Sequence, residues 1–209
     1  MIKIAVAKGR VAKQAVKLFE EFGITFSDFD TNRKLILDSD DKSVQMVLVK
    51  PSDTPIYVES GVCDCGIVGK DILMEDNPDV YRLLPLNIGR CRMCVCGHEG
   101  TDIKNMKQIV VASKFVNTAK AYFDSLGMKA RIIKINGSVE LAPLLHMSDV
   151  IVDIVESGKT LEENGLEVLE EIIDIYSVFI VNKASLKMKH SALKPFIDNL
   201  KDANERLLG

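Results

Sequence analysis

The sequence lacks a hydrophobic stretch as long as a membrane span requires, and it has no recognisable export signal. The apolar start, Met1–Ala7, meets Lys8 and Arg10 before the hydrophobic segment of a signal peptide could form. Positive charge is not in excess either, because the formal net charge is −3. Sequence-independent binding of nucleic acid needs a basic surface. We therefore expect a cytoplasmic protein without membrane or nucleic-acid partners.

Cysteine is scarce and odd in number. Five cysteines in a chain without an export signal argue against a disulfide framework. Their C-x-C and C-x₂-C-x-C spacing, with His98 nearby, invites a zinc site, and a zinc-bound regulatory protein is the weakest of the alternatives. However, Cys63 and Cys65, like Cys94 and Cys96, have strand spacing inside apolar runs. Free cysteine packs there as a small hydrophobe, and we favour this interpretation.

Linkers rich in glycine, serine or proline are also absent, as are repeats and low-complexity segments. Apolar β-branched runs alternate with segments of helical spacing, which predicts an α/β fold of two lobes, each a mixed or parallel sheet with flanking helices. Lobe I would comprise 1–90 and 178–209, and lobe II 91–177. Small ligands commonly bind in a cleft between such lobes.

The expected elements follow from apolar periodicity and from the glycine, proline and capping residues at their ends. The expected strands are Met1–Ala7, Arg33–Asp38, Val44–Val49, Val62–Val68, Val80–Leu86, Arg90–Gly97, Gln108–Ser113, Ala130–Ile135, Val150–Val155, Leu166–Asp174 and Tyr176–Asn182. The expected helices are Val11–Phe22, a short helix between Pro51 and Gly61, a helix opened by Gly69, a capped turn at Thr101–Met106, and Phe115–Leu126, Ser138–Leu145, Thr160–Asn164 and Ser191–Leu207.

The turn Glu156–Thr160 follows the predicted strand Val150–Val155 directly. A Gly/Ser/Thr turn between a strand and a helix start presents free N–H groups, for which phosphate is the usual anion. An ordinary turn capped by Ser157 or Thr160 is the alternative. The carboxylates of Asp153 and Glu156 suit a phosphate ligand that also carries hydroxyls or Mg²⁺, as a ribose phosphate would.

Basic turns follow two other predicted strands. Lys8, Gly9 and Arg10 come after the first strand, at the carboxyl end where open α/β sheets bind ligands. A solvated turn explains the same residues equally well. A second basic turn, Gly-Lys-Asp, ends at Asp71. We interpret Asp71 primarily as an N-cap candidate and secondarily as a ligand contact.

Five stretches resemble the short-form ATP phosphoribosyltransferases in order and spacing, over nearly the whole chain. The pattern NGSVELAP followed by D-x-x-x-D-x-V-E-S-G-x-T-L is highly specific. The long form of this family has an additional C-terminal regulatory domain, which we do not expect in a chain that ends at Gly209. The stretches are AKGR (Ala7–Arg10), PSDTPIYVESGVCDCGIVGKDIL (Pro51–Leu73), GRCRMCV (Gly89–Val95), INGSVELAPLL (Ile135–Leu145) and DVIVDIVESGKTLEENGLEVLEEI (Asp149–Ile172).

The resemblance implies a type II periplasmic-binding-protein-like architecture and a pentosyltransferase reaction, the first step of histidine biosynthesis. N1 of ATP would attack C1 of 5-phosphoribosyl-1-diphosphate and expel diphosphate, with Mg²⁺ as cofactor. No general base is demanded, because adenine N1 has its own lone pair, and no histidine lies in the motifs. Catalysis should come from alignment and from stabilising the leaving diphosphate.

The same resemblance implies the site residues. Lobe II would hold the 5-phosphate in the turn Glu156–Thr160, and Asp153 or Glu140 would lie near the ribose hydroxyls or Mg²⁺, since protein ligands alone are not expected to hold the metal. Asp71 would lie near the nucleotide. The catalytic cations would be Lys8, Arg10 and Lys50, and the substrate-binding residues Gly9, Asp71, Glu140, Asp153, Glu156, Ser157, Gly158, Lys159 and Thr160.

The sequence departs from the family at several positions. Lys50 stands where the family usually has arginine, and lysine lacks the bidentate fork. Ala7 replaces the usual proline, and His146 begins a stretch that is usually Gly-Leu-Ala-Asp. The resemblance further implies a homodimer and assembly with a histidyl-tRNA-synthetase-like regulatory subunit. A two-lobed module that binds a small anion is the weaker alternative, because fold alone cannot separate the two.

Overall fold

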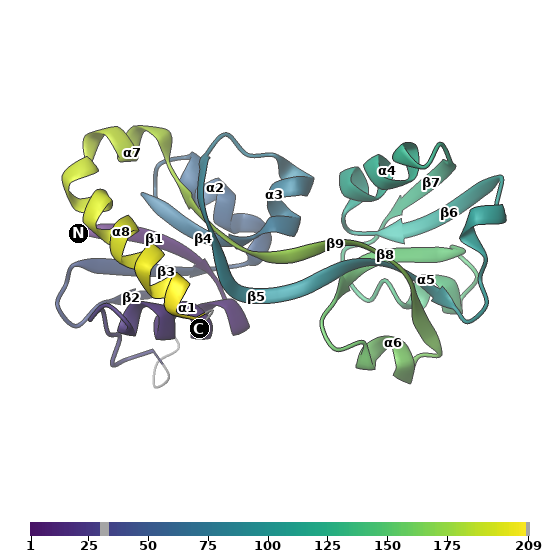
Figure 1. Ribbon diagram of the computed structural model, residues 1–209, viewed down its shortest axis with the longest axis horizontal. Helices are drawn as coiled ribbons and strands as arrows, with labels where there is room; N and C mark the ends of the chain where they lie inside the picture. The colour runs from purple at the N-terminus through teal and green to yellow at the C-terminus, as the bar shows by residue number, and fades with distance from the viewer. Residues whose placement is uncertain (30–33, 208–209) are drawn as a thin grey trace. The chain divides into compact units, whose positions relative to one another are not determined.

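The computed structural model describes residues 1–29 and 34–207, and the chain divides into two compact units (Figure 1). Unit 1 comprises Met1–Gly89 and Tyr176–Gly209, and unit 2 comprises Arg90–Ile175. Two long strands, β5 (Tyr81–His98) and β9 (Leu166–Val181), belong to both units. No helix of the described residues is long and apolar enough to span a membrane.

The sheet of unit 1 is built on three parallel strands, β1 (Ile2–Ala7), β3 (Val44–Val49) and β4 (Cys65–Gly69). Strand β1 pairs in parallel with both β3 and β4, and Ala7 lies opposite Val49. The antiparallel strands β2 (Ile36–Asp38) and β9 complete this part of the sheet. The predicted pairing of β2 with β3 is confirmed from Ile36 onward, whereas the predicted start at Arg33 lies outside the described residues.

Two helices with apolar faces cover the core of unit 1. Helix α1 (Arg10–Glu20) buries Ala12, Ala15, Val16, Leu18 and Phe19 at the spacing of one helical face. Helix α8 (His190–Arg206) packs against it, with 5.7 Å between the ring centroids of Phe19 and Phe196. Burying each ring stabilises the fold by roughly 1.5–3 kcal/mol. The other helices of unit 1 are η1 (Pro51–Asp53), α2 (Thr54–Glu59), α3 (Lys70–Asp76) and α7 (Lys183–Met188).

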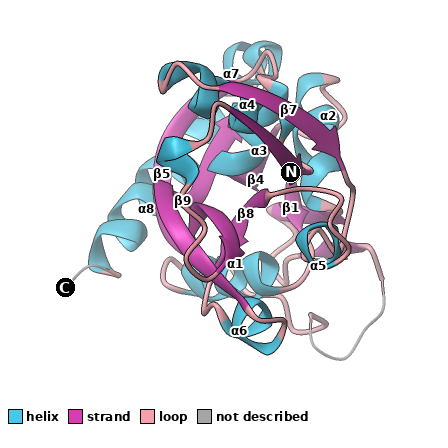
Figure 2. Cartoon of the chain, turned by 90° about the vertical axis from the view of Figure 1, so that its right-hand side faces the viewer, coloured by secondary structure: helices cyan, strands magenta, loops and turns pink. Residues whose placement is uncertain are grey.

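The sheet of unit 2 has the strand order β5-β8-β6-β7. Strand β6 (Gln108–Ser113) pairs in parallel with β7 (Lys129–Lys134) and β8 (Val150–Val155), whereas β5 and β8 are antiparallel. Helices alternate with these strands along the chain, as Figure 2 shows in cyan and magenta. The helices are η2 (Ile103–Asn105), α4 (Val116–Ser125), α5 (Leu141–Leu144) and α6 (Lys159–Glu163).

The predictions of two shorter strands in place of β5, and again in place of β9, were wrong. In the sequence, Asn87 and Gly89 are typical of a turn between two strands. In the structure, however, side chains distant in sequence accept hydrogen bonds from their backbone N–H groups. Asn204 Oδ1 accepts from Asn87 N at 2.7 Å, and Gln14 Oε1 accepts from Gly89 N at 2.8 Å. The chain therefore continues as a strand through a glycine with φ of 67°.

Two further boundaries differ from the prediction. The strand expected at Val62–Val68 begins only at Cys65, and the Val62 side chain is exposed. Helix α7 was missed. Its start is capped by Asn182, whose Oδ1 accepts from the N–H groups of Ala184 and Ser185 at 3.0 and 2.9 Å.

The cysteines confirm the packing interpretation. Cys63, Cys65, Cys94 and Cys96 are fully buried. Burial raises the pKa of the Cys63 thiol to about 11 and that of Cys96 to about 12. These thiols stay protonated at neutral pH and contribute as apolar groups.

A buried carboxylate ties the start of β4 to the C-terminal helices. Asp64 accepts hydrogen bonds from Lys3 N, Ser185 Oγ and Lys189 Nζ at 2.9, 2.9 and 2.8 Å. Burial alone would raise the pKa of Asp64, but these donors outweigh it and the pKa is lowered. Its stabilisation is therefore fully present above the unfolded pKa of about 3.9 and is lost as the pH falls through the lower folded-state pKa.

Asp64→Asn is expected to lower the free energy of unfolding by about 2–3 kcal/mol at pH 7, because the charge-assisted hydrogen bonds are lost. The difference from the parent chain should shrink as the pH falls below about 4, where Asp64 protonates first in the unfolded chain and then, at lower pH, in the folded chain. Urea unfolding at several pH values measures both effects. The matched control is Asp198→Asn in the exposed Lys194–Asp198 pair, which should cost about 0.5 kcal/mol or less. Equal losses in the two variants would contradict this account of Asp64.

Candidate functional site

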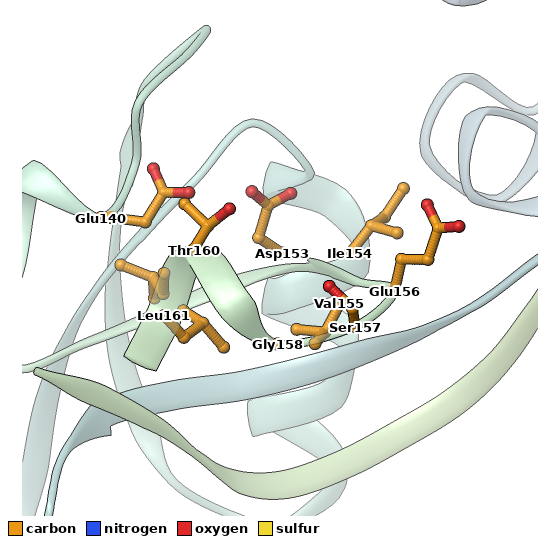
Figure 3. A pocket seen from close by; sticks show the side chains of 10 residues that line it. Glu140, Asp153, Ile154, Val155, Glu156, Ser157, Gly158, Thr160 and Leu161 are labelled. Carbon is orange, nitrogen blue, oxygen red and sulfur yellow. The ribbon is translucent and has the colours of Figure 1, made fainter. Parts of the chain in front are cut away.

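A cavity of about 240 Å³ opens in unit 2 where β8 ends (Figure 3). Three segments form it: strand β8, the turn and helix that follow, and Glu140 just before α5. Six of the residues predicted from sequence come together here. The lining residues are Glu140, Ile151, Asp153, Ile154, Val155, Glu156, Ser157, Gly158, Thr160 and Leu161.

The turn into α6 depends on Gly158. This residue has φ of 79° and ψ of −8°, a left-handed conformation that other residues rarely adopt. Its carbonyl accepts from the N–H groups of Leu161 and Glu162 at 3.0 and 3.1 Å and so starts the helix. Within the described residues, the N–H groups of Ser157 and Gly158 donate to no backbone carbonyl. The turn therefore has amide donors to offer to an anion.

Carboxylates form the other polar part of the cavity. Asp153 lies opposite Cys94 in the β5–β8 register, so it interrupts an otherwise apolar and buried strand face. Figure 3 shows the carboxylates of Asp153 and Glu140 directed to the same side of the cavity, with the Thr160 hydroxyl nearby. These groups can accept hydrogen bonds from sugar hydroxyls.

The apolar floor of the cavity was not predicted. Ile151, Val155 and Leu161 line it and are buried in the core of unit 2, which also contains Cys94 and Cys96. Their strand and helix periodicity indicated burial but gave no sign of a cavity. Lys159, which the sequence placed in the site, does not line the cavity, since α6 begins there and the lining set passes from Gly158 to Thr160.

The site residues predicted in the first lobe lie at the carboxyl ends of parallel strands in unit 1. Lys8 follows β1, and its N–H donates to the carbonyl of Val49 at 2.9 Å, which places it beside Lys50 at the end of β3. Gly9, with φ of 90°, precedes Arg10, the first residue of α1. Lys8, Arg10 and Lys50 are exposed, so their charges are accessible to a ligand.

Asp71 is not the N-cap that the sequence predicted. Gly69 holds that position, and Asp71 lies one residue into α3, almost fully buried. Its carboxylate folds back against Gly69, so that a Cβ added there would lie 2.0 Å from Asp71 Oδ1. The absence of a side chain at Gly69 is therefore what lets the Asp71 carboxylate occupy its place.

The fold defines the class of protein to which the chain belongs. The periplasmic aliphatic sulphonate binding protein SsuA from Escherichia coli has a TM-score of 0.64 at 12% identity, over 97% of this chain and 72% of that one. At this identity the likeness concerns the fold alone. It confirms the predicted α/β architecture of the type II periplasmic-binding-protein kind.

Sequence relatives define the family within this class. The HisG family model, ATP phosphoribosyltransferase, matches residues 50–202. The ATP phosphoribosyltransferase of Brachyspira hyodysenteriae is 50% identical over 97% of this chain and 99% of that one, and that of Caldicellulosiruptor bescii is 47% identical over 100% and 99%. The ATP phosphoribosyl transferase (HisG:HisZ) complex from Thermotoga maritima matches with a TM-score of 0.82 and 33% identity, over 99% of this chain and 100% of that one.

The chain belongs to the ATP phosphoribosyltransferase family, in its short form. It is a pentosyltransferase of the first step of histidine biosynthesis, and the family, enzyme class and reaction expected from the sequence are thus confirmed.

Proposed function

We propose that the chain transfers the phosphoribosyl group of 5-phosphoribosyl-1-diphosphate to N1 of ATP, with the 5-phosphate held in the turn Glu156–Thr160. The cavity at the end of β8 is the observation that carries this assignment. It combines the left-handed Gly158, amide donors that have no backbone acceptor in the part of the chain that the structure describes, and the hydroxyls of Ser157 and Thr160. These are the donors that phosphate oxygens require.

The carboxylates of the cavity would orient the sugar. Asp153 and Glu140 can accept hydrogen bonds from the ribose hydroxyls and so fix C1 for attack. Their oxygens are also the donors that Mg²⁺ prefers, and the ion would neutralise charge on the substrate diphosphate when bound. Among the described residues, no group of three or more His, Cys, Asp or Glu side chains could hold a metal. We therefore propose that any Mg²⁺ arrives with the substrate.

The cations of unit 1 would stabilise the leaving group. Lys8, Arg10 and Lys50 stand at or just beyond the carboxyl ends of β1 and β3, where their charges can meet the diphosphate and the ATP phosphates. Stabilising the charge that grows on the departing diphosphate lowers the barrier without a general base. Asp71 would contact the nucleotide.

Assembly and location are further parts of the proposal. The Thermotoga maritima structure is a HisG:HisZ complex, which supports a hetero-oligomer of this chain with a regulatory subunit of that kind. We also propose a homodimer as the catalytic unit and a cytoplasmic location.

The decisive experiment mixes purified protein with ATP, 5-phosphoribosyl-1-diphosphate and Mg²⁺ and follows the absorbance of the N1-substituted adenine. Turnover is expected, and omission of either substrate is the blank. Failure of turnover both alone and with a HisZ-type subunit would overturn the proposal. Tight binding of a small anion under those conditions would instead favour the binding-module alternative.

Lys50→Arg is expected to retain or raise kcat, by up to about threefold, because the guanidinium fork can bind two diphosphate oxygens at once. Lys50→Gln is the matched control and should lower kcat by at least about tenfold, since the charge is removed. Initial rates at saturating substrates measure both. A large loss in Lys50→Arg would mean that Lys50 contributes something other than charge to the reaction.

A further inference from the structure

We infer that Lys70 is a further anion-binding residue of the same site, and that the ring of Tyr176 is what positions it. This inference rests on the proposed function, because the anion it would bind is a phosphate group of a substrate. The groups that Lys70 would bind are the phosphate oxygens of a diphosphate or a triphosphate chain.

The register of the parallel strands in unit 1 brings Lys70 into line with Lys8 and Lys50. Three adjacent parallel strands of unit 1 are each followed directly by lysine: Lys8 after β1, Lys50 after β3 and Lys70 after β4. Ala7 lies opposite Val49, and Val6 lies opposite Ile67, so the three strands end within about a residue of one another. Because the carboxyl ends of parallel strands meet at one edge of a sheet, the three lysines form one row.

The side chain of Lys70 is held by its surroundings. Its Nζ lies 5.0 Å from the centroid of the Tyr176 ring, in a cation–π contact. The side chain is half-buried, whereas those of Lys8 and Lys50 are exposed. A lysine held against a ring loses less conformational entropy on binding an anion than a freely moving one. Lys70 is therefore the member of the row that is best held in place before a substrate arrives.

A small cavity beside this pair shows how the two side chains are held. It has a volume of about 260 Å³ and includes Lys70, Tyr176, Leu73 and Arg82. Arg82 Nη2 donates to the carbonyl of Leu73 at 3.1 Å and to Asn77 Oδ1 at 2.9 Å, so its guanidinium fastens α3 to the start of β5. Lys70 is therefore the first residue of a helix that is anchored near its far end, and its ammonium group lies over the Tyr176 ring.

The test compares Lys70→Gln with Lys70→Arg in steady-state kinetics of the whole protein. Lys70→Gln is expected to raise the KM of one substrate by about tenfold, as the loss of a charge-assisted hydrogen bond does, with kcat within about twofold. Lys70→Arg should restore KM to within about threefold. A raised KM for ATP assigns Lys70 to the triphosphate, and a raised KM for 5-phosphoribosyl-1-diphosphate, with weaker inhibition by inorganic diphosphate, assigns it to the diphosphate.

Tyr176 is tested as a positioning residue. Tyr176→Leu should raise the same KM as Lys70→Gln, whereas Tyr176→Phe, which keeps the ring, should leave it unchanged. The matched control is Lys183→Gln, because Lys183 Nζ also lies over a ring, 5.7 Å from the centroid of Tyr81. Lys183 follows the end of β9, which pairs with the first residue of β4, so it stands at the opposite edge of the sheet.

If the parent chain turns over normally and Lys70→Gln leaves the KM of both substrates unchanged, the inference about Lys70 is overturned and the proposed function is not. An equal rise in Lys183→Gln would overturn it as well, since the effect would then be one of overall charge. Absence of turnover in the parent chain would count against the proposed function instead. Isothermal titrations with inorganic diphosphate and with ATP would then still decide the role of Lys70, since equal affinities of the parent and Lys70→Gln chains for both ligands would overturn it.

Discussion

Gly158→Val is expected to weaken binding of 5-phosphoribosyl-1-diphosphate at least about 100-fold, which corresponds to about 2.7 kcal/mol. The residue has φ of 79°, and a β-branched side chain in this region costs roughly 1–2 kcal/mol for the backbone alone. Space is not the obstacle, since the nearest atom to an added Cβ is Val155 Cγ1 at 4.0 Å. The turn would instead relax, and the N–H groups of Ser157 and Gly158 would leave the positions proposed for phosphate binding.

A matched glycine separates this effect from general strain. Gly127, in the turn between α4 and β7, has φ of 69° and no atom within 4 Å of an added Cβ. Gly127→Val should lower stability by a similar amount and leave substrate affinity unchanged. Calorimetric titration with 5-phosphoribosyl-1-diphosphate measures affinity, and thermal unfolding measures stability. Unchanged affinity in Gly158→Val would show that the 5-phosphate binds elsewhere.

Local sequence predicted those parts of the fold whose conformation is favoured by adjacent residues. Strand β8 and the turn at Gly158 are examples, because a run of β-branched residues favours a strand and glycine readily adopts the left-handed conformation of the turn. The continuity of β5 through Gly89 is the opposite case. It depends on Gln14, which lies 75 residues from Gly89 in sequence, and on Asn204, which lies 117 residues from Asn87, and no pattern near Gly89 contains that information.

The candidate site divides in the same way. The turn Glu156–Thr160 and the basic ends of β1 and β3 follow from motifs on adjacent residues. The position of Glu140 at the same cavity as Thr160 does not, because α5 and α6 lie in separate segments that only the folded sheet brings together. Asp71 shows a further limit, since an acidic residue near a helix start resembles a cap, and only the fold reveals that its carboxylate lies against Gly69.

Asp153→Asn is expected to lower kcat/KM for 5-phosphoribosyl-1-diphosphate by about 100-fold, or about 2.7 kcal/mol. Asparagine has nearly the same shape, so the core around Ile151 and Val155 should be undisturbed and thermal stability should change little. Under the proposed function, the variant would lose a charged acceptor for the ribose hydroxyls and a ligand for Mg²⁺, and both losses would disturb the alignment of C1.

The direction of this change decides between two roles for Asp153. Three carboxylates line the cavity, and their negative charges repel the phosphates of a substrate. If this repulsion were the only effect of Asp153, neutralising its carboxylate would strengthen substrate binding. A fall in KM would therefore contradict the proposed role, whereas a loss of kcat/KM together with a higher Mg²⁺ requirement would support it. Glu163→Gln is the matched control, because Glu163 is an exposed carboxylate of helix α6, which follows β8, and does not line the cavity. Its kinetics should match those of the parent chain, since long-range charge effects at such a site are screened by salt.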